Sequence, residues 1–82
     1  MKLNLLVNIG TEMERKLNSI GIYSSEELKD LGSKLTFKML KAHYPEICLV
    51  HLYSLQGAIN GVEFNKLSDE MKSELKKNIV IV

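Results

Sequence analysis

Apolar residues recur every three or four positions along most of the chain, which is the spacing of helices that bury one face. The first run consists of Met13, Leu17 and Ile20. Thr11 precedes it, and Glu14 follows Thr11 by three residues, a spacing typical of a capping box at a helix N-terminus. Gly21 is expected to end the run. The pattern therefore predicts a first helix over about residues 11–20.

A second, shorter helix is predicted directly afterwards. Ser24 and Glu27 repeat the capping spacing at its start. Its apolar stripe consists of Leu28 and Leu31. Gly32 stands where a left-handed C-terminal cap is expected, so this helix should be about two turns long.

Ser33 is predicted to cap a third helix. The apolar residues of this helix are Phe37, Leu40 and Tyr44. Pro45 disfavours helical geometry in the residue before it, so the third helix should end at His43 or Tyr44.

Beyond this point the apolar residues occupy nearly the whole circumference of a helix. They are Ile47, Leu49, Val50, Leu52, Tyr53, Leu55, Ala58 and Ile59. Proline is favoured at the first helical position, so we expect Pro45 to begin this fourth helix and Gly61 to end it. A helix that is apolar all round is buried, so this one should be central.

A last helix is expected after a connecting turn that holds Phe64 and Leu67, with Ser68 as its cap. Its apolar residues, spaced by four, are Met71, Leu75 and Ile79. The run Ile79–Val82 is entirely β-branched. It is interpreted either as the docked or frayed end of this helix or as a short strand that pairs with another molecule.

These elements predict an all-α fold, a compact bundle of about five short helices that forms a single domain over residues 1–82. At 82 residues and 9.3 kDa the core is small, so an elaborate enclosed active site is not expected. Eleven basic against ten acidic residues leave a net charge of +1, which excludes a polybasic tail. No secretory signal and no apolar run of about 20 residues is present, so no membrane association is predicted.

Candidate catalytic and metal-binding residues are few. Cys48 is the only cysteine, which fits a reducing compartment and predicts a cytoplasmic protein. With His43 and His51 it makes fewer ligands than a zinc site needs, so no metal or other cofactor is expected. Cys48 lies in the most apolar segment and is interpreted as a buried, unreactive thiol. Since no catalytic motif is present, we do not expect an enzyme or a small-molecule substrate.

A turn near the N-terminus is a candidate nucleic-acid-binding feature. It consists of Asn8, Ile9 and Gly10 and leads into the predicted helix at Thr11. Outward backbone N–H groups at such a turn form an anion site, as in helix-hairpin-helix DNA-binding modules. Two features oppose this role: Asn8 stands where those modules usually have glycine, and Glu12 and Glu14 would repel a phosphate.

A second candidate feature is a run of lysines, Lys29, Lys34, Lys38 and Lys41. Asp30 is the only acidic residue among them, which leaves a local charge of +3. Such a face suits weak contacts to phosphate groups, and it is equally typical of an ordinary solvated helix surface.

Several short stretches point to a family. Residues 52–61 read LYSLQGAING, and NIG, IGI and LG stand at 8–10, 20–22 and 31–32. With these stretches, nearly the whole chain resembles the C-terminal domain of the TfoX/Sxy family, proteins linked to regulation of natural DNA transformation in bacteria. The resemblance implies a helix-hairpin-helix-like fold, a regulatory role and no catalytic residues. Full-length relatives carry an N-terminal domain absent from this sequence, so activities that depend on that domain are not expected.

Within the LYSLQGAING stretch, Gly57 falls in the interior of the predicted fourth helix. Glycine at such a position lowers helix stability. We therefore expect another helix or turn to approach closely there.

Two functions follow as hypotheses. The first is a non-enzymatic regulatory domain that contacts a protein partner or a second copy of itself, through parts of the third predicted helix or through the tail Ile79–Val82. The alternative is a weak, sequence-independent DNA-binding module that uses the turn at residues 8–10 and the four lysines.

Overall fold

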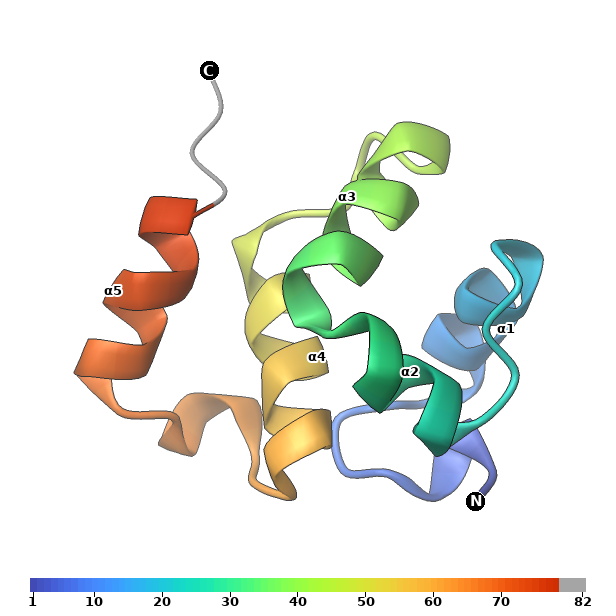
Figure 1. Cartoon of the computed structure of the whole chain (residues 1–82), viewed down its shortest axis with the longest axis horizontal. Coiled ribbons are helices and arrows are strands. Elements are labelled where there is room, and N and C mark those ends of the chain that lie inside the picture. The colour runs from blue at the N-terminus through green and yellow to red at the C-terminus, as the bar shows by residue number, and fades with distance from the viewer. Residues whose placement is uncertain (79–82) are drawn as a thin grey trace.

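The computed structural model describes residues 1–78 and consists of helices joined by short turns (Figure 1). The elements are η1 (Leu3–Leu5), α1 (Thr11–Ser19), α2 (Ser25–Leu31), α3 (Ser33–His43), α4 (Leu49–Asn60), η2 (Phe64–Lys66) and α5 (Asp69–Asn78), where η marks a 3₁₀ helix. β-pairing within the described residues is limited to a single bridge between Lys2 and Ser24. The radius of gyration is 11.6 Å, close to the roughly 12 Å of a compact chain of this length. The predicted all-α bundle of five short helices is confirmed.

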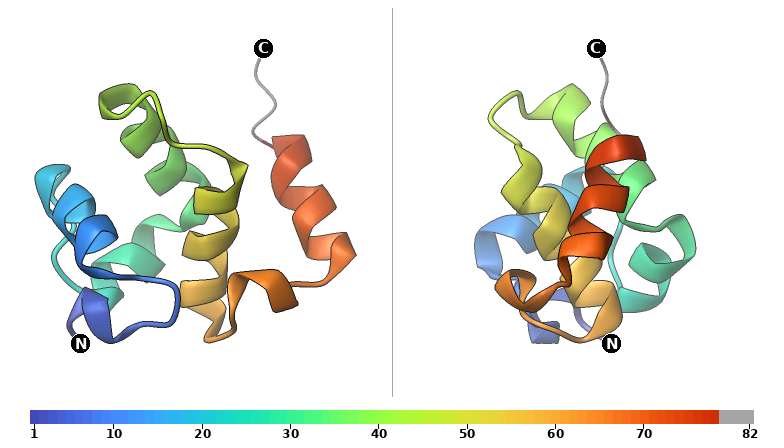
Figure 2. Two further views of the ribbon diagram at one scale, coloured as in Figure 1. Left: turned by 180° about the vertical axis from the view of Figure 1, so that it is seen from behind. Right: turned by 90° about the vertical axis from the view of Figure 1, so that its left-hand side faces the viewer.

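α4 is the central helix, as its apolar circumference predicted. It packs against α2, α3, α5 and η2. Figure 1 shows α1 and α2 on one side of α4 and α5 on the other, and Figure 2 shows α5 running alongside α4 after the η2 connection. Leu52 and Leu55 of α4 are fully buried.

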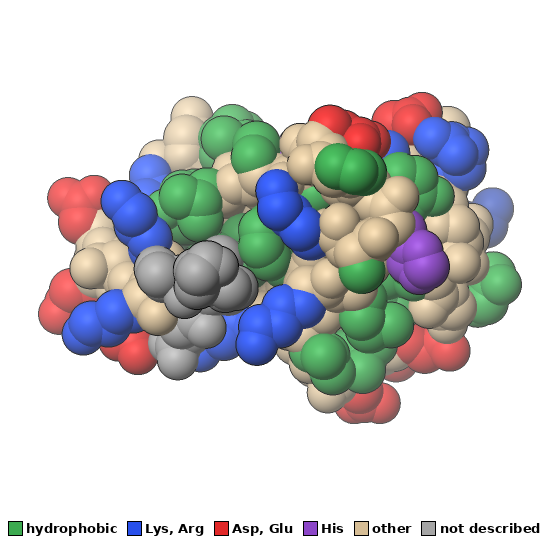
Figure 3. Space-filling view, turned by 90° about the horizontal axis from the view of Figure 1, so that it is seen from above, with side chains coloured by type: hydrophobic (Ala, Val, Ile, Leu, Met, Phe, Trp, Pro, Cys, Tyr) green, Lys and Arg blue, Asp and Glu red, His purple; other side chains and the backbone are tan. Residues whose placement is uncertain are grey.

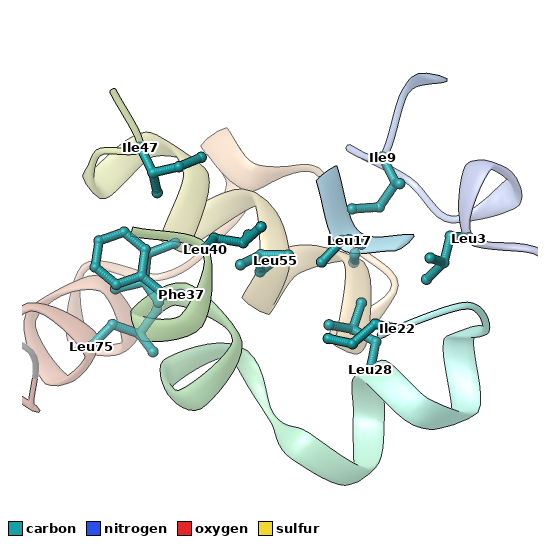
Figure 4. Packing of buried hydrophobic residues seen from close by; sticks show 12 residues of the cluster. Leu3, Ile9, Leu17, Ile22, Leu28, Phe37, Leu40, Ile47, Leu55 and Leu75 are labelled. Atoms are coloured by element: carbon teal, nitrogen blue, oxygen red, sulfur yellow. The ribbon is translucent and has the colours of Figure 1, made fainter. Parts of the chain in front are cut away.

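The buried side chains form one continuous cluster that joins all five α-helices (Figure 4). On one side, Leu75 of α5 lies beside Phe37 of α3. On the other, Leu17 of α1 lies close to Ile22 and Leu28. Because α5 contributes a buried leucine to the common core, it is an integral part of the bundle.

Two of the predicted helix caps are confirmed. At α2, the Glu27 N–H donates to Ser24 Oγ at 3.2 Å. At α5, the Met71 N–H donates to Ser68 Oγ at 3.1 Å. Each bond satisfies one of the free backbone donors in a first helical turn.

The predicted caps Thr11 and Ser33 are wrong, because each is the first helical residue and a glycine precedes it as the N-cap. Gly32 has φ 83° and ψ 162°, so it ends α2 with positive φ but outside the left-handed helical region. The chain turns sharply at this glycine, and Ser33 faces inward, where its hydroxyl donates to Gln56 Oε1 at 2.5 Å.

The predicted start of the fourth helix at Pro45 is also wrong. α4 begins at Leu49 with Cys48 as N-cap, and the Cys48 N–H donates to His51 Nδ1 at 3.0 Å. The physical reason is Ile47: its side chain enters the core while its backbone belongs to the loop before α4 and not to a helix. Lys41 Nζ stabilises this loop by donating to the carbonyl oxygens of Pro45 at 3.3 Å and Ile47 at 2.7 Å.

Gly61 ends α4, as predicted, and it adopts the left-handed conformation, with φ 76° and ψ 26°. In the turn that follows, Leu67 is buried and Phe64 is partly exposed. The tail Ile79–Val82, for which two interpretations were open, lies outside the described residues.

Candidate interaction surface

The turn at Asn8, Ile9 and Gly10 is fastened to the far end of the sequence. Asn8 Nδ2 donates to the carbonyl oxygens of Val62 at 3.0 Å and Ser54 at 3.3 Å. Its Oδ1 accepts from the Phe64 N–H at 3.1 Å. One side chain thus joins the N-terminal turn to α4 and to the segment that leads into η2. Asn8 itself has φ 72°, a left-handed conformation that asparagine tolerates better than most residues.

The close approach predicted at Gly57 is confirmed, and Asn8 makes it. A Cβ atom on Gly57 would lie 2.5 Å from Asn8 Nδ2 and 2.6 Å from the Val62 carbonyl oxygen. Both distances are too short for a carbon atom. Glycine is therefore required where the N-terminal turn meets α4.

These contacts give the turn a structural role. Besides the bonds of Asn8, the Ile9 N–H donates to the Leu6 carbonyl at 3.2 Å, and the Ile9 side chain is buried. Gly10 and Thr11 are exposed. In the first turn of α1, a hydrogen bond from Arg15 lowers the pKa of Glu12, so this carboxylate stays ionised beside the turn. Arg15 is also the ion-pair partner of Glu12, so it offsets part of the negative charge beside the turn. Anion binding here remains a prediction.

The four candidate lysines have different environments. Lys41 holds the loop before α4, as described above. Lys34 and Lys38 are four residues apart on α3 and therefore lie on one side of it. Lys29 belongs to α2 and is exposed. Within residues 1–78, no ion pair or side-chain hydrogen bond engages Lys29, Lys34 or Lys38.

Apolar side chains lie next to these lysines. The exposed residues of α3 include Leu35, Lys38, Lys41 and Ala42, whereas Lys34 is half-buried. Leu35 is 47% exposed, and Leu31, at the end of α2, is 37% exposed. The apolar stripe predicted for the second helix includes Leu31, and no prediction covers Leu35. The available signal was that Leu35 falls out of phase with the buried Phe37 and Leu40.

A shallow hollow of about 270 Å³ lies where α2 meets α3. It is lined by Leu31, Gly32, Ser33, Lys34 and Gln56. The Gln56 side chain accepts from Ser33 and donates to Asn60 Oδ1 at 3.1 Å, which fixes its position. Enclosed sites for small molecules are usually larger and cover most of their ligand, so this hollow suits a single side chain of a larger partner.

Figure 3 shows the end of the bundle where α3 and α5 terminate, seen from above. Lysine and arginine side chains lie among hydrophobic ones across the middle of this face, and acidic side chains gather toward its margins. Cationic and apolar groups are therefore mixed on this face of the bundle.

The expected burial of Cys48 is wrong. Cys48 is exposed, because it is the N-cap residue of α4 and not part of the buried helix. Its Sγ lies 3.5 Å from His51 Nδ1. In the described part of the chain, no three His, Cys, Asp or Glu side chains are grouped so that they could hold a metal ion. The helices over residues 1–78 include none long and apolar enough to span a membrane.

Two solved structures similar to this one come from Listeria monocytogenes. A triclinic crystal structure of an uncharacterized protein shares 38% sequence identity with a TM-score of 0.91, over 95% of this chain and 89% of that one. A tetragonal crystal structure of a protein of unknown function shares 39% identity with a TM-score of 0.89, over 94% of each chain. No curated protein is significantly similar to the chain.

The family comparison agrees with the resemblance seen in the LYSLQGAING stretch. The family model of the TfoX C-terminal domain matches residues 1–79, nearly the whole sequence. The chain belongs to the TfoX C-terminal domain family.

Proposed function

We propose that this protein is a non-enzymatic regulatory domain that acts in the cytoplasm through contact with another protein. Family membership supports a regulatory role, and the resemblance to TfoX/Sxy proteins directs it toward control of DNA transformation. The observation that carries the proposal is the partly exposed Leu31, which lines the hollow between α2 and α3, followed by the exposed Leu35 in the first turn of α3. Grouped apolar side chains at a surface with polar surroundings are typical of protein contacts.

The chemistry of the surface supports contact rather than catalysis. The hollow is lined by two aliphatic or small residues, a serine, a lysine and a glutamine, and it holds no carboxylate, imidazole or thiol. The exposed Cys48 and the half-buried His51 lie at the start of α4, whereas Gln56 lines the hollow from further along that helix. The thiol and the imidazole, which could act as nucleophile and base, therefore do not line the hollow.

DNA binding is the second candidate. The observation in its favour is that Lys34 and Lys38 are unpaired within residues 1–78 and share one side of α3. Two observations make it weaker. First, exposed leucines adjoin these lysines, and contacts between the lysines and phosphate groups would leave the leucines in water. At the other candidate position, the Asn8 side chain is already used by the fold.

Site-specific photo-crosslinking in living cells separates the two functions. Benzoylphenylalanine is placed at residue 35 or, as a matched control, at residue 5, since Leu35 and Leu5 are both exposed leucines, 47% and 69%. After irradiation, the adducts are treated with nuclease or with protease. We expect a protein adduct at residue 35 that is absent at residue 5. A nuclease-sensitive adduct at residue 35 would replace the proposal with DNA binding, and no adduct beyond the control would reject both uses of this surface.

A further inference from the structure

We propose that the hollow between α2 and α3 binds an acidic amphipathic segment of a partner protein. An apolar side chain of that segment occupies the hollow beside Leu31, a neighbouring apolar group contacts Leu35, and its carboxylates pair with Lys34 and Lys38. We call these four residues, together with the hollow that Leu31 and Lys34 help to line, the α2–α3 corner. This inference rests on the proposed function and adds the chemistry of the partner.

The charge of the corner supports a carboxylate-bearing partner. Residues 31–45 contain three lysines and no aspartate or glutamate. Of the three, Lys41 is engaged by the loop carbonyls, whereas Lys34 and Lys38 have no acidic partner within the described chain. With Asp30 directly before this stretch, the local charge stays positive, although the chain as a whole is nearly neutral.

Lys34 is also placed against the preference of its helix. It lies in the first turn of α3, where the helix dipole disfavours a positive charge, and that turn contains no acidic residue. By contrast, the first turns of α1, α2 and α5 each contain two acidic residues. α4, like α3, has no acidic residue in its first turn, but it carries no lysine there. A carboxylate from a partner would supply at α3 the negative charge that α1, α2 and α5 carry themselves.

The apolar part of the corner supports a side chain as anchor. Leu31 lines the hollow, and Leu35, in the first turn of α3, is 47% exposed. The polar lining is rigid, because Gln56 is held by Ser33 on one side and by Asn60 on the other. At protein interfaces, buried apolar anchors usually supply most of the binding free energy, and charged groups that pair across the interface supply selectivity.

Fluorescence anisotropy with the full chain tests this inference. The probe is a labelled synthetic peptide designed as an amphipathic helix, with leucines on one face and glutamates beside them. The matched probe has glutamine at every glutamate position, and a labelled DNA duplex is titrated in parallel. We expect the glutamate peptide to bind, and the glutamine peptide to bind at least about tenfold more weakly.

Variants locate the binding. Lys34→Glu with Lys38→Glu should weaken binding of the glutamate peptide at least about tenfold. Lys76→Glu with Lys77→Glu, exposed lysines of α5, makes the same change in net charge and should alter it no more than about twofold. Leu35→Ser should weaken binding and Leu5→Ser should not. Helical circular dichroism checks each fold, and Lys34→Gln with Lys38→Gln replaces the first pair if that pair unfolds.

Three results would overturn the inference: no binding of the glutamate peptide, equal binding of both peptides, or tight binding of the duplex that is lost in the Lys34 and Lys38 variant. Concentration-dependent dimerisation abolished by the same variant would also overturn it, in favour of a second copy as occupant. A protein adduct at residue 35 in cells, found together with any of these results, would retain the proposed function and reject only the acidic partner.

Discussion

The Asn8 side chain lies directly against Gly57, so that a methyl group on Gly57 would stand 2.5 Å from Asn8 Nδ2. These residues are 49 positions apart in the sequence, and their contact closes the N-terminal turn onto the central helix. The same amide group bonds the chain on both sides of Gly61, at Ser54 and Val62. The glycine and the asparagine therefore depend on each other.

Replacing Gly57 with alanine should destabilise the protein, although alanine favours helices. The added Cβ would meet Asn8 Nδ2 and, at 2.6 Å, the Val62 carbonyl, which is backbone and cannot turn away. Overpacking of this kind outweighs the gain in helix propensity, for a net loss of about 1 to 2 kcal/mol in the free energy of unfolding. Urea denaturation measures it. Gly10→Ser is the control, since open space surrounds that position and serine is a good N-cap; a loss in both variants alike would contradict the explanation.

Asn8→Asp should cost about 2 to 3 kcal/mol of unfolding free energy, because the Nδ2 donor would be replaced by a carboxylate oxygen facing two carbonyl oxygens. Asn8→Gly also loses all three hydrogen bonds, but glycine accepts φ 72° without strain and places no carboxylate against the two carbonyl oxygens. Its loss of unfolding free energy should therefore be smaller than that of Asn8→Asp. The matched control is Asn4→Asp, since Asn4 is an exposed residue of η1. Thermal unfolding of the three variants gives the order, and an Asn8→Asp variant as stable as Asn4→Asp would disprove the role of the amide.

Local patterns in the sequence were sufficient for much of this fold. The caps at Ser24 and Ser68, the end of α4 at Gly61 and the central place of α4 all follow from signals within a few residues. Gly57 indicated that another segment approaches α4 closely, because glycine inside a helix lowers the stability of that helix. Its neighbour could not be named, since nothing near residue 57 in the sequence points to Asn8.

The errors have the same origin. Pro45 satisfies the rule for a first helical residue, but the burial of Ile47 from an extended loop moves the start of α4 to Leu49 and brings Cys48 to the surface. At the candidate surface, the lysine spacing on α3 was readable, whereas the exposure of Leu31 and Leu35 depends on which side α4 covers. Sequence periodicity describes one helix at a time, and a surface is defined by how several pack.

Glu26 should contribute to acid sensitivity. Its carboxylate pairs with the Met1 ammonium at 2.9 Å, which lowers the pKa of Glu26 from 4.5 to about 2. A carboxyl whose pKa is lower in the folded protein stabilises it above the unfolded pKa, and this contribution is lost as the pH falls from about 4.5 toward 2. Glu26→Gln should therefore flatten the pH dependence of the melting temperature in that interval. Glu70→Gln removes a carboxylate without the Met1 ammonium, and an equal flattening there would refute the pairing.

Lys41 and Lys38 should respond differently to the same substitution, although both are exposed lysines of α3. Lys41→Met removes the donor to the carbonyls of Pro45 and Ile47, one of them partly buried, and should cost about 1 to 2 kcal/mol of unfolding free energy. Lys38→Met removes no bond within the described residues and should leave stability nearly unchanged. Denaturant unfolding decides between them. Equal losses would mean that the lysine bonds to the loop carry no stability, and that Lys41 is as free to meet a partner as Lys38.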